Sequence, residues 1–331
     1  MLHSRIVGTG FHVPERVVTN DDFAKVMDTT DEWIRTRTGI QERHWVREGE
    51  TGADLARAAA ARALEMAEVT PQELDAIVYA TSTPDHYAPG GGVFLQRAMG
   101  LSGIPAMDIH QACSGFIYSL SVADAWIRSG QFRRILVVGA EIQSTAMDVS
   151  SRGRNTAVIF ADGAAAVVLV PTETPTQGLL AFDLHSQGEH AELLWVDTPG
   201  CMYHPRITKQ HIDEGRHFLQ MDGKEVFRHA VTRMPESVRA VLGRIGATPA
   251  DLTLLLPHQA NLRISEMVQR ELELRDDQVY NNIQRYGNTT AATIGILLDE
   301  CVRGGRVKSG DLLVMTAFGA GFSWGSAACR W

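Results

Sequence analysis

The chain has 331 residues, of which 44% are hydrophobic and 21% charged, an ordinary composition for a soluble globular protein. Its net charge of −8 argues against a general nucleic-acid-binding protein, because such a protein needs a basic surface. No apolar run approaches the roughly 18 residues of a membrane helix, so no membrane association is expected. The four cysteines show no CxxC spacing, which argues against a disulfide framework or a zinc site. Reduced thiols and a cytoplasmic location are therefore expected.

Strand-like apolar runs alternate with helical patterns along the chain. The clearest are LDAIVYATS (74–82), GGGVFLQRAMG (90–100), IPAMDI (104–109), SGFIYSLSVADAWIRSG (114–130) and RRILVVGAE (133–141). This alternation is typical of an α/β layered fold. The runs ILVVGA and LLVMTAFG are continuously apolar, as expected for strands that helices cover on both faces.

The second half of the sequence repeats the first. The segment VTPQELDAIVYATS (69–82), with Thr-Pro at 70–71, is echoed by ATPADLTLLLPHQA (247–260), with Thr-Pro at 248–249. The segment WIRSGQFRRILVVGA (126–140), with an Arg-x-Gly turn at 128–130, is echoed by CVRGGRVKSGDLLVMTAFG (301–319), with the same turn at 303–305. Two matches in the same order at nearly the same spacing predict a duplicated unit and a pseudo-twofold α/β fold.

This duplication predicts an N-terminal half at 1–173 and a C-terminal half at 174–331. Within the second half, the segment at about 184–218 is rich in His, Gly and Pro and is expected to be a long irregular insertion. Loops of this length are usually functional or mobile, so this one is a candidate lid over a site.

Cys113 follows the predicted strand at 104–109 and opens the predicted helix at 114–130. A thiol at a helix N-terminus faces unpaired N–H groups and the positive end of the helix dipole. Both favour the thiolate, and such a position can lower a cysteine pKa to roughly 3.5–7.5. Its small neighbours would let a substrate carbonyl approach closely. On this stretch alone, a nucleophile and a buried structural cysteine are equally good interpretations.

Two further polar residues stand at comparable positions. Asn288 lies in the second-half turn that is equivalent to the cysteine turn, and His258 lies where the strand in LLLPHQANLRI ends. Ligands of open α/β sheets gather outside the carboxyl ends of the strands. A thiolate that attacks a thioester, with His and Asn N–H groups that stabilise an oxyanion, would suit acyl transfer. The turn at 317–325 could supply a further backbone N–H, although a tight turn between two strands also explains it.

Six motifs, taken together, resemble those of a known family. They are TDEWIRTRTGI, ACSGF, RGRNTAVIFADGAAAVVL, PHQANLRI, RYGNTTAA and the ending AFGAGFSWGSA. In this order they are similar to the 3-oxoacyl-[acyl-carrier-protein] synthase III family, a branch of the thiolase superfamily. The resemblance implies a five-layer αβαβα fold of two pseudo-symmetric halves, a homodimer, and an acyltransferase-type condensing enzyme that starts fatty acid biosynthesis.

The resemblance also implies a role for each polar group. Cys113 matches the nucleophile that takes an acyl group from acyl-CoA. His258 and Asn288 match the pair that assists decarboxylation of malonyl-acyl carrier protein (malonyl-ACP) and binds the enolate oxygen. The backbone N–H groups of Cys113 and Ala320 match an oxyanion hole for the acyl carbonyl. The products would be 3-oxoacyl-ACP, CoA and CO2, and the resemblance implies no metal and no organic cofactor.

Other positions match residues that bind CoA or close the acyl pocket. Trp33 and Arg152 match residues that hold the CoA adenine between them, Arg37 one that reaches the phosphates, and Gly223 a position in the pantetheine channel. Ala88 stands where short-chain enzymes carry a Phe that crosses the dimer and blocks the end of the acyl pocket. Because burying each extra CH2 is worth about 0.8 kcal/mol where room exists, Ala88 predicts tolerance of medium or longer acyl chains.

Arg263 and Arg270 lie seven residues apart on the predicted helix after His258, hence on one face. They match the basic patch that docks the acidic carrier protein. Without the resemblance, an ordinary solvated helix face would be the preferred interpretation.

Two alternatives stay open. The motif CSG in place of the common CAG, and two extra residues around Arg152, are reminiscent of specialised branches of secondary metabolism. Such an enzyme would use malonyl-CoA, a β-keto acid or another acceptor with the same acylated cysteine. A non-catalytic dimeric subunit that holds a carrier protein is the other alternative, and the presence of all three polar groups argues against it.

Overall fold

The protein is built around two β-sheets, one from each half of the chain, in a computed structural model that describes residues 3–331. The first sheet has the strand order β1-β7-β6-β4-β5 and the second the order β11-β12-β13-β8. The first comprises β1 (His3–His12), β4 (Ala76–Ala80), β5 (Ala106–Ile109), β6 (Ile135–Ile142) and β7 (Asp162–Thr172). The second comprises β8 (Gly178–Ser186), β11 (Leu254–Pro257), β12 (Leu312–Gly319) and β13 (Ser323–Arg330).

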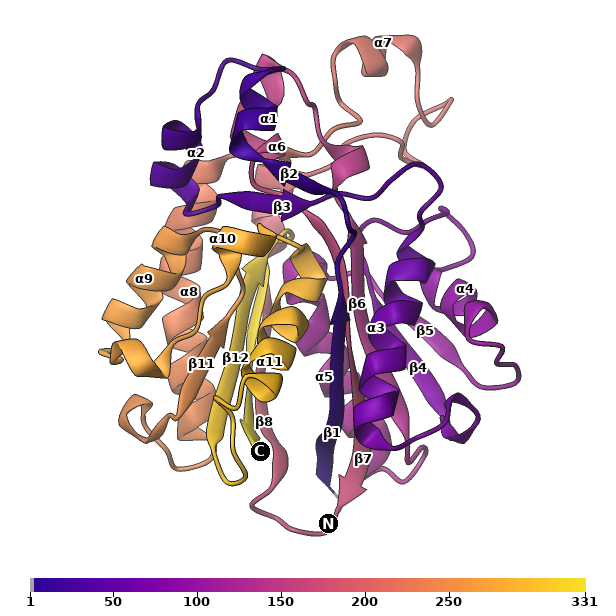
Figure 1. The fold of residues 1–331 in the computed structure, drawn as a ribbon, viewed down its shortest axis with the longest axis vertical. Helices are drawn as coiled ribbons and strands as arrows, with labels where there is room; N and C mark the ends of the chain where they lie inside the picture. The colour runs from indigo at the N-terminus through magenta and orange to yellow at the C-terminus, as the bar shows by residue number, and fades with distance from the viewer. Residues whose placement is uncertain (1–2) are drawn as a thin grey trace.

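Helices form three layers around and between these sheets (Figure 1). The long helices are α3 (Gly52–Ala67), α4 (Gly91–Ala98), α5 (Gly115–Arg128), α8 (Gly223–Gly243), α9 (Leu262–Glu271) and α11 (Thr293–Arg303). The helices α3 and α4 cover the outer face of the first sheet, α8 and α9 cover the outer face of the second, and α5 and α11 lie between the sheets. The layers therefore run α, β, α, β, α, as predicted.

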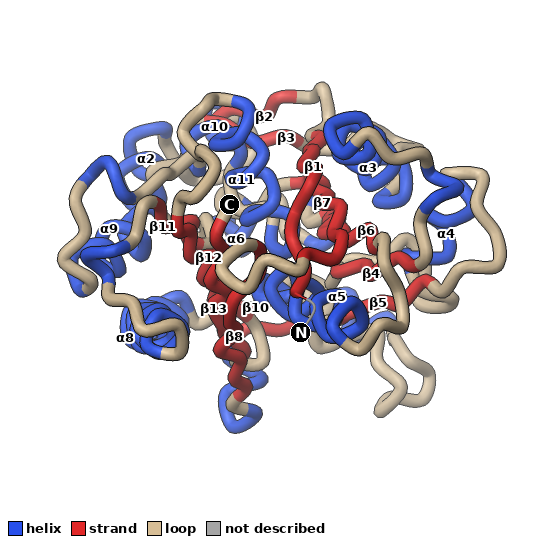
Figure 2. Tube along the Cα trace, turned by 90° about the horizontal axis from the view of Figure 1, so that it is seen from below, coloured by secondary structure: helices blue, strands red, loops and turns tan. Residues whose placement is uncertain are grey.

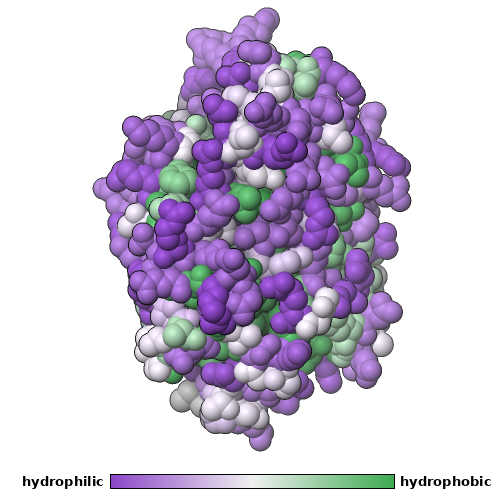
Figure 3. All heavy atoms as spheres, turned by 60° about the vertical axis from the view of Figure 1, so that its left-hand side comes forward, coloured by the Kyte–Doolittle hydropathy of each residue, from purple (hydrophilic) through white to green (hydrophobic). Residues whose placement is uncertain are grey.

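The smaller elements lie at the periphery of these layers. They are β2 (Val17–Thr19), α1 (Asn20–Ala24), α2 (Asp31–Thr38), β3 (Glu42–His44), α6 (Arg154–Ala157), β9 (Leu194–Trp195), α7 (Lys209–Asp213), β10 (Gln220–Met221) and α10 (Ile283–Tyr286). None of the helices within residues 3–331 combines the length and hydropathy that a membrane crossing needs. The face presented in Figure 3 is largely hydrophilic, with small scattered hydrophobic spots.

The middle layer explains the continuously apolar segments of the sequence. Seen from below, α5 and α11 lie between the two sheets (Figure 2). On α5, Phe116 and Leu120 are fully buried, and α11 is buried from Thr293 through Asp299. A helix that is apolar on nearly all sides must be enclosed in this way. Every residue of β6 and β12 is likewise buried, as expected for strands with helices on both faces.

The predicted duplication extends to the topology and the backbone conformation. The order β1-β7-β6-β4 in the first sheet corresponds to β8-β13-β12-β11 in the second. In each half a parallel pair, β4 with β6 or β11 with β12, is followed by antiparallel strands. Two non-glycine residues with positive φ, Ala112 (φ 44°) and Thr290 (φ 50°), have the same separation along the chain as the two Thr-Pro pairs. Each lies just before one helix of the middle layer.

The segment that was expected to be an irregular insertion carries short elements. The strand β8 continues to Ser186, and β9, α7 and β10 follow before α8 begins. Arg216 donates to the carboxylate of Asp197 at 2.5 Å, and the hydroxyl of Tyr203 donates to the same carboxylate at 2.7 Å. In Figure 1, α7 projects at the top of the molecule, away from the layers. The predicted division at 173/174 falls in the connection between β7 and β8.

Candidate active site

Cys113 lies in a tight turn between β5 and α5. The turn Ala112–Ser114 has 3-10 geometry and leads directly into the helix. The Ser114 hydroxyl donates to the carbonyl of Gln111 at 2.9 Å and lies 2.7 Å from the hydroxyl of Ser323, which opens β13. The turn is therefore tied to the second sheet, and Cys113 is only 6% exposed.

The end of β12 packs directly against this turn. A Cβ atom added at Gly319 would lie 2.6 Å from the Cβ and 3.1 Å from the Sγ of Cys113, so only glycine fits there. The next residue is Ala320, and the backbone N–H groups of Ala320 and of Cys113 itself favour the thiolate form of Cys113. Two backbone N–H groups from different segments of the chain thus act on the same side chain.

The resting thiol is protonated, contrary to the expectation from the sequence. Burial raises the pKa of Cys113 to about 12, and the carboxylate of Glu141 raises it further, whereas the two backbone N–H groups lower it. The sequence-based expectation of a lowered pKa was wrong because it counted the donors at the helix start and not the loss of water around the sulfur.

His258 lies at the C-terminal end of β11, beside β12. Its backbone N–H donates to the carbonyl of Thr316 at 2.8 Å, and the residue is 2% exposed. Neither ring nitrogen has a hydrogen-bond partner among residues 3–331. Burial lowers the pKa of His258 to about 3, so the imidazole is neutral at pH 7. A buried ring with two unpaired nitrogens is costly and points to a partner that arrives with a substrate.

Asn288 lies in the turn before α11. Its backbone pairs with the segment before β7, donating to Ile159 and accepting from Ala161, each at 2.9 Å. Its Oδ1 accepts the N–H of Thr290 at 2.9 Å, which orients the amide and leaves Nδ2 as the donor for a ligand. The side chain is almost fully buried, at 3% exposure.

The structure brings the elements that carry these residues together. The turn Ala112–Ser114 contacts both β12 and the turn Thr290–Ala292, and β11 and β12 run parallel, so their carboxyl ends share an edge. The segments that carry Cys113, Ala320, His258 and Asn288 are thereby gathered at one end of the two sheets. This set can hold an acyl group covalently and stabilise a second oxyanion.

Trp33 and Arg37 lie on α2, but Arg152 is not the arginine that stacks on the indole ring. The guanidinium carbons of Arg37 and Arg154 lie 4.5 and 4.7 Å from the Trp33 ring centre. Arg152 donates instead to the carboxylate of Asp148 at 2.5 Å. The motif RGR offers two arginines two residues apart, and only the folded chain distinguishes them.

The remaining predicted site residues are spread over three elements. Gly223 is the first residue of α8, after the N-cap Asp222. Arg263 and Arg270 are both exposed on α9, and Arg263 donates to the carbonyl of Thr36 at the end of α2 at 2.6 Å. Ala88 is exposed in the segment between β4 and α4.

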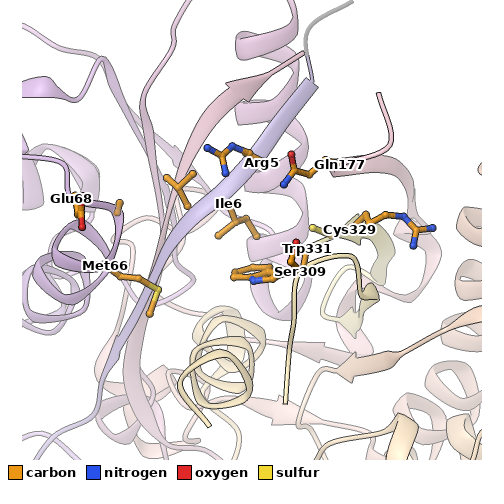
Figure 4. A pocket seen from close by; sticks show the side chains of 11 residues that line it. Arg5, Ile6, Met66, Glu68, Gln177, Ser309, Cys329 and Trp331 are labelled. Carbon is orange, nitrogen blue, oxygen red and sulfur yellow. The ribbon is translucent and has the colours of Figure 1, made fainter. Parts of the chain in front are cut away.

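A pocket of the described residues lies elsewhere. It has a volume of about 460 Å3 and is enclosed by the start of β1, the end of α3 and the C-terminal residues (Figure 4). Its lining includes Arg5, Glu68, Gln177 and Trp331 and none of the predicted site residues. Within residues 3–331, no group of three or more His, Cys, Asp or Glu side chains could hold a metal ion.

Comparison with known proteins decides the family. Residues 107–188 match the model described as 3-oxoacyl-[acyl-carrier-protein] synthase III, and residues 242–331 match the model of its C-terminal part. A beta-ketoacyl-[acyl-carrier-protein] synthase III from Xylella fastidiosa is 46% identical, covering 100% of this chain and 99% of the relative. The chain belongs to the 3-oxoacyl-[acyl-carrier-protein] synthase III family.

Solved structures of synthase III proteins have the same fold. The Aquifex aeolicus synthase III is 41% identical with a TM-score of 0.91, covering 99% of this chain and 100% of its own. The priming β-ketosynthase of the R1128 polyketide pathway is 33% identical with a TM-score of 0.91, covering 99% of this chain and 96% of its own. The predicted family, thiolase-like fold and acyltransferase-type enzyme class are thereby confirmed.

Sequence reasoning missed three residues that lie close to the predicted site residues. Gly319 permits the contact with Cys113, Arg154 packs on Trp33, and Glu141 places a buried carboxylate beside the site. Gly319 belongs to the motif AFG and Arg154 to the motif RGR, so the sequence contained a signal for these two residues. No local pattern marks Glu141, because its neighbours come from distant parts of the chain.

Proposed function

We propose that this synthase III catalyses the decarboxylating condensation of an acyl-CoA with malonyl-ACP, giving 3-oxoacyl-ACP, CoA and CO2, with Cys113 as the acyl carrier. The observation that carries the proposal is the meeting of the buried Cys113 turn with the end of β12 and the turn Thr290–Ala292, while β11, which ends before the unpaired ring of His258, runs parallel beside β12. The reaction starts fatty acid synthesis and needs no metal or organic cofactor. Four free cysteines suit a reducing cytoplasm.

In the first half-reaction, the Cys113 sulfur attacks the thioester carbonyl of acyl-CoA. The carbonyl oxygen becomes an oxyanion that accepts hydrogen bonds from the backbone N–H groups of Cys113 and Ala320. The bond from carbonyl carbon to CoA sulfur then breaks, and the CoA thiolate takes up the proton that Cys113 lost. The products are acyl-Cys113 and free CoA.

In the second half-reaction, malonyl-ACP loses CO2 and leaves an enolate. The enolate oxygen accepts hydrogen bonds from the side-chain N–H groups of His258 and Asn288. The enolate carbon attacks the acyl carbonyl, whose oxygen again occupies the site made by Cys113 and Ala320. The Cys113 thiolate leaves and takes up one proton from water, which balances the carboxylate charge lost as CO2. Because decarboxylation generates the carbanion in place, the neutral His258 need only donate, which suits a ring that stays unprotonated at pH 7.

For acyl-CoA binding we propose that Trp33 and Arg154 hold the adenine, with Arg37 near the phosphates and Gly223 beside the pantetheine. Arg154→Ala should raise the KM for acyl-CoA by about 2- to 30-fold, since a cation–π contact is worth about 0.5–2 kcal/mol. Arg152→Ala is the matched control and should change the KM much less, because Arg152 is paired with Asp148. Steady-state KM values for acyl-CoA test this, and a larger effect at Arg152 would contradict it.

The malonyl-ACP partner is proposed to dock on α9 through Arg263 and Arg270. Both guanidinium groups are exposed on this helix, which begins four residues after His258. Arg263 also binds the end of α2, and the Asn261 amide donates to the carbonyl of Arg37 at 3.0 Å. A docked carrier protein would therefore lie between the CoA-binding helix and the His258 strand. Positive charge there would speed its encounter with an acidic partner.

We further propose that the enzyme is a homodimer and that it accepts medium-length acyl chains. β5 is an edge strand with half-buried Met107 and Ile109, and an open edge of this kind favours pairing with a second strand. Tyr87, beside Ala88, is 68% exposed in the single chain, which suits a segment that a partner covers.

The test is intact-protein mass spectrometry after mixing the enzyme with acetyl-, butyryl-, octanoyl- or decanoyl-CoA. We expect wild-type protein to gain one acyl mass, including octanoyl, and to lose it with CO2 release when malonyl-ACP is added. The Cys113→Ser variant should gain no acyl group that malonyl-ACP can remove. Light scattering on the same samples should give the mass of two chains. If no acyl-CoA loads the wild type, the proposed function is wrong.

A second candidate acceptor is favoured by the 33% identical priming β-ketosynthase of a polyketide pathway. In that case acyl-Cys113 would form but would be discharged by malonyl-CoA, a β-keto acid or another acceptor rather than by malonyl-ACP. Offering these acceptors in turn to the loaded enzyme distinguishes primary from secondary metabolism.

A further inference from the structure

Glu141 is a buried carboxylate that neither half-reaction uses. It is the last residue but one of β6 and is 0% exposed. Burial raises the pKa of Glu141 to about 7, opposed by hydrogen bonds from Thr83, Ser82 and Ala291. An acid in such a position is costly unless its oxygens are satisfied, so its partners indicate what it holds in place.

One set of partners is the turn that follows β4. The hydroxyl of Thr83 donates to Oε2 of Glu141 at 2.5 Å, and the backbone N–H of Ser82 donates to Oε1 at 3.1 Å. The hydroxyl of Ser82 lies 3.1 Å from both oxygens. Glu141 therefore fixes the carboxyl end of the strand next to β5, which leads to Cys113.

The other set of partners is the turn that carries Asn288. The backbone N–H of Ala291 points at Oε1 of Glu141 at 3.5 Å. Gln143 bridges the two, since its Nε2 donates to the Thr290 hydroxyl at 2.9 Å and lies 3.5 Å from Oε2 of Glu141. Thr290 in turn donates its N–H to Oδ1 of Asn288. A short chain of hydrogen bonds thus links the carboxylate to the amide that faces the site.

The backbone of the turn Thr290–Ala292 also packs closely against β6. A Cβ atom added at Gly139, two residues before Glu141 on β6, would lie 2.5 Å from the carbonyl oxygen of Ala291. The turn therefore rests directly on the strand. Thr290 has a positive φ of 50°, a conformation that is strained for a non-glycine residue and persists only where its surroundings impose it.

We infer that Glu141 is a positioning residue for the condensation step, holding the strained Thr290 turn so that the Asn288 amide faces the enolate oxygen. The inference rests on the proposed function. It separates the two half-reactions, because Glu141 binds the turn of Asn288 and makes no hydrogen bond to the turn Ala112–Ser114 among the described residues.

Electrostatics predicts opposite effects on the two steps. Above pH 7, where Glu141 is mostly ionised, its negative charge raises the pKa of Cys113, so removing that charge lowers the pKa of the thiol and increases the thiolate fraction. Loading from acyl-CoA should then be unchanged or faster. Condensation should be slower, because an amide at this position cannot accept all the N–H and O–H donors that the carboxylate satisfies.

The experiment measures both steps separately in Glu141→Gln and wild type. Stopped-flow or quenched mass spectrometry gives the rate of acyl loading, and the same protein, preloaded, gives the rate of discharge by malonyl-ACP. We expect discharge to fall about 10- to 100-fold while loading stays within two-fold or rises. A wild type that never loads would overturn the proposed function and this inference together.

Two further variants keep the outcome interpretable. Gln143→Ala removes the bridge to Thr290 and leaves the Glu141 side chain itself in place, and should slow discharge by several-fold while loading stays at the wild-type rate. Asp124→Asn is the control, since Asp124 is a buried acid on α5 that binds Ser4. It should lower the melting temperature without separating the two rates. If Glu141→Gln slows both steps equally or neither, while wild type turns over, the inference is wrong.

Discussion

His258→Ala is expected to slow condensation by about 10²–10³-fold while acyl groups still load onto Cys113. The ring is neutral, since burial lowers its pKa to about 3, and neither nitrogen has a partner among the described residues. Removing it therefore costs the resting protein no side-chain hydrogen bond. The sulfur of Cys113 contacts backbone donors rather than this ring, so the loading machinery is left intact.

The measurement is the discharge of octanoyl-loaded enzyme by malonyl-ACP, followed by intact mass and CO2 release. His211→Ala is a matched control, because His211 is also buried but belongs to α7 in the segment before α8. It should leave both steps near the wild-type rate. Failure of the His258 variant to load at all would show that the imidazole removes the thiol proton, and would contradict the division of roles proposed above.

The duplication could be predicted because short sequence motifs repeat in both halves of the chain. Thr-Pro turns and Arg-x-Gly turns are short-range signals, and they place equivalent strands and helices in both halves without any knowledge of packing. The structure extends the repeat to Ala112 and Thr290, whose left-handed conformations occur at equivalent positions of the two halves. A positive φ at Ala or Thr has no signature in the sequence, since it is imposed by the sheets that meet at the turn.

The state of the thiol could not be predicted in this way. The start of a helix favours a thiolate only where water also reaches the sulfur. The sequence indicates where the helix starts, but it does not show whether the sulfur is exposed to water. Here the end of β12 closes over Cys113, and burial outweighs the two N–H groups, so the pKa is raised to about 12. The contact is made between residues 113 and 319, and only the pseudo-twofold assembly of the halves brings them together.

The same limit explains Arg154 and Glu141. The motif RGR predicts an arginine beside Trp33, but the choice between Arg152 and Arg154 depends on how the short turn before α6 packs against α2. In the sequence, Glu141 is only the residue that follows an apolar run. Its proposed positioning role depends on hydrogen bonds from Ser82 and Ala291, which are distant in the chain. Residues whose function depends on long-range contacts require the fold.

Gly319→Ala is expected to reduce acyl loading by at least 100-fold. The added methyl carbon would lie 2.6 Å from the Cβ of Cys113 and 3.0 Å from its backbone nitrogen, well inside the ~3.5–4.0 Å at which carbon atoms are in contact. Relief of this overlap must move β12 and the cysteine turn apart. The two N–H groups proposed as oxyanion donors, those of Cys113 and Ala320, lie in the cysteine turn and directly after β12, and a displacement of about 1 Å in such a site can cost about 10²-fold.

Gly243→Ala is the matched control, because a Cβ atom at this position of α8 meets nothing within 4 Å. Alanine is also favoured over glycine in a helix by about 0.5–1 kcal/mol, so this variant should load normally and melt no lower than wild type. The comparison requires loading rates and thermal melting of both variants. A Gly319→Ala protein that folds and loads at the wild-type rate would mean that the N–H of Ala320 does not stabilise the acyl oxyanion, because the displaced donor would have been dispensable.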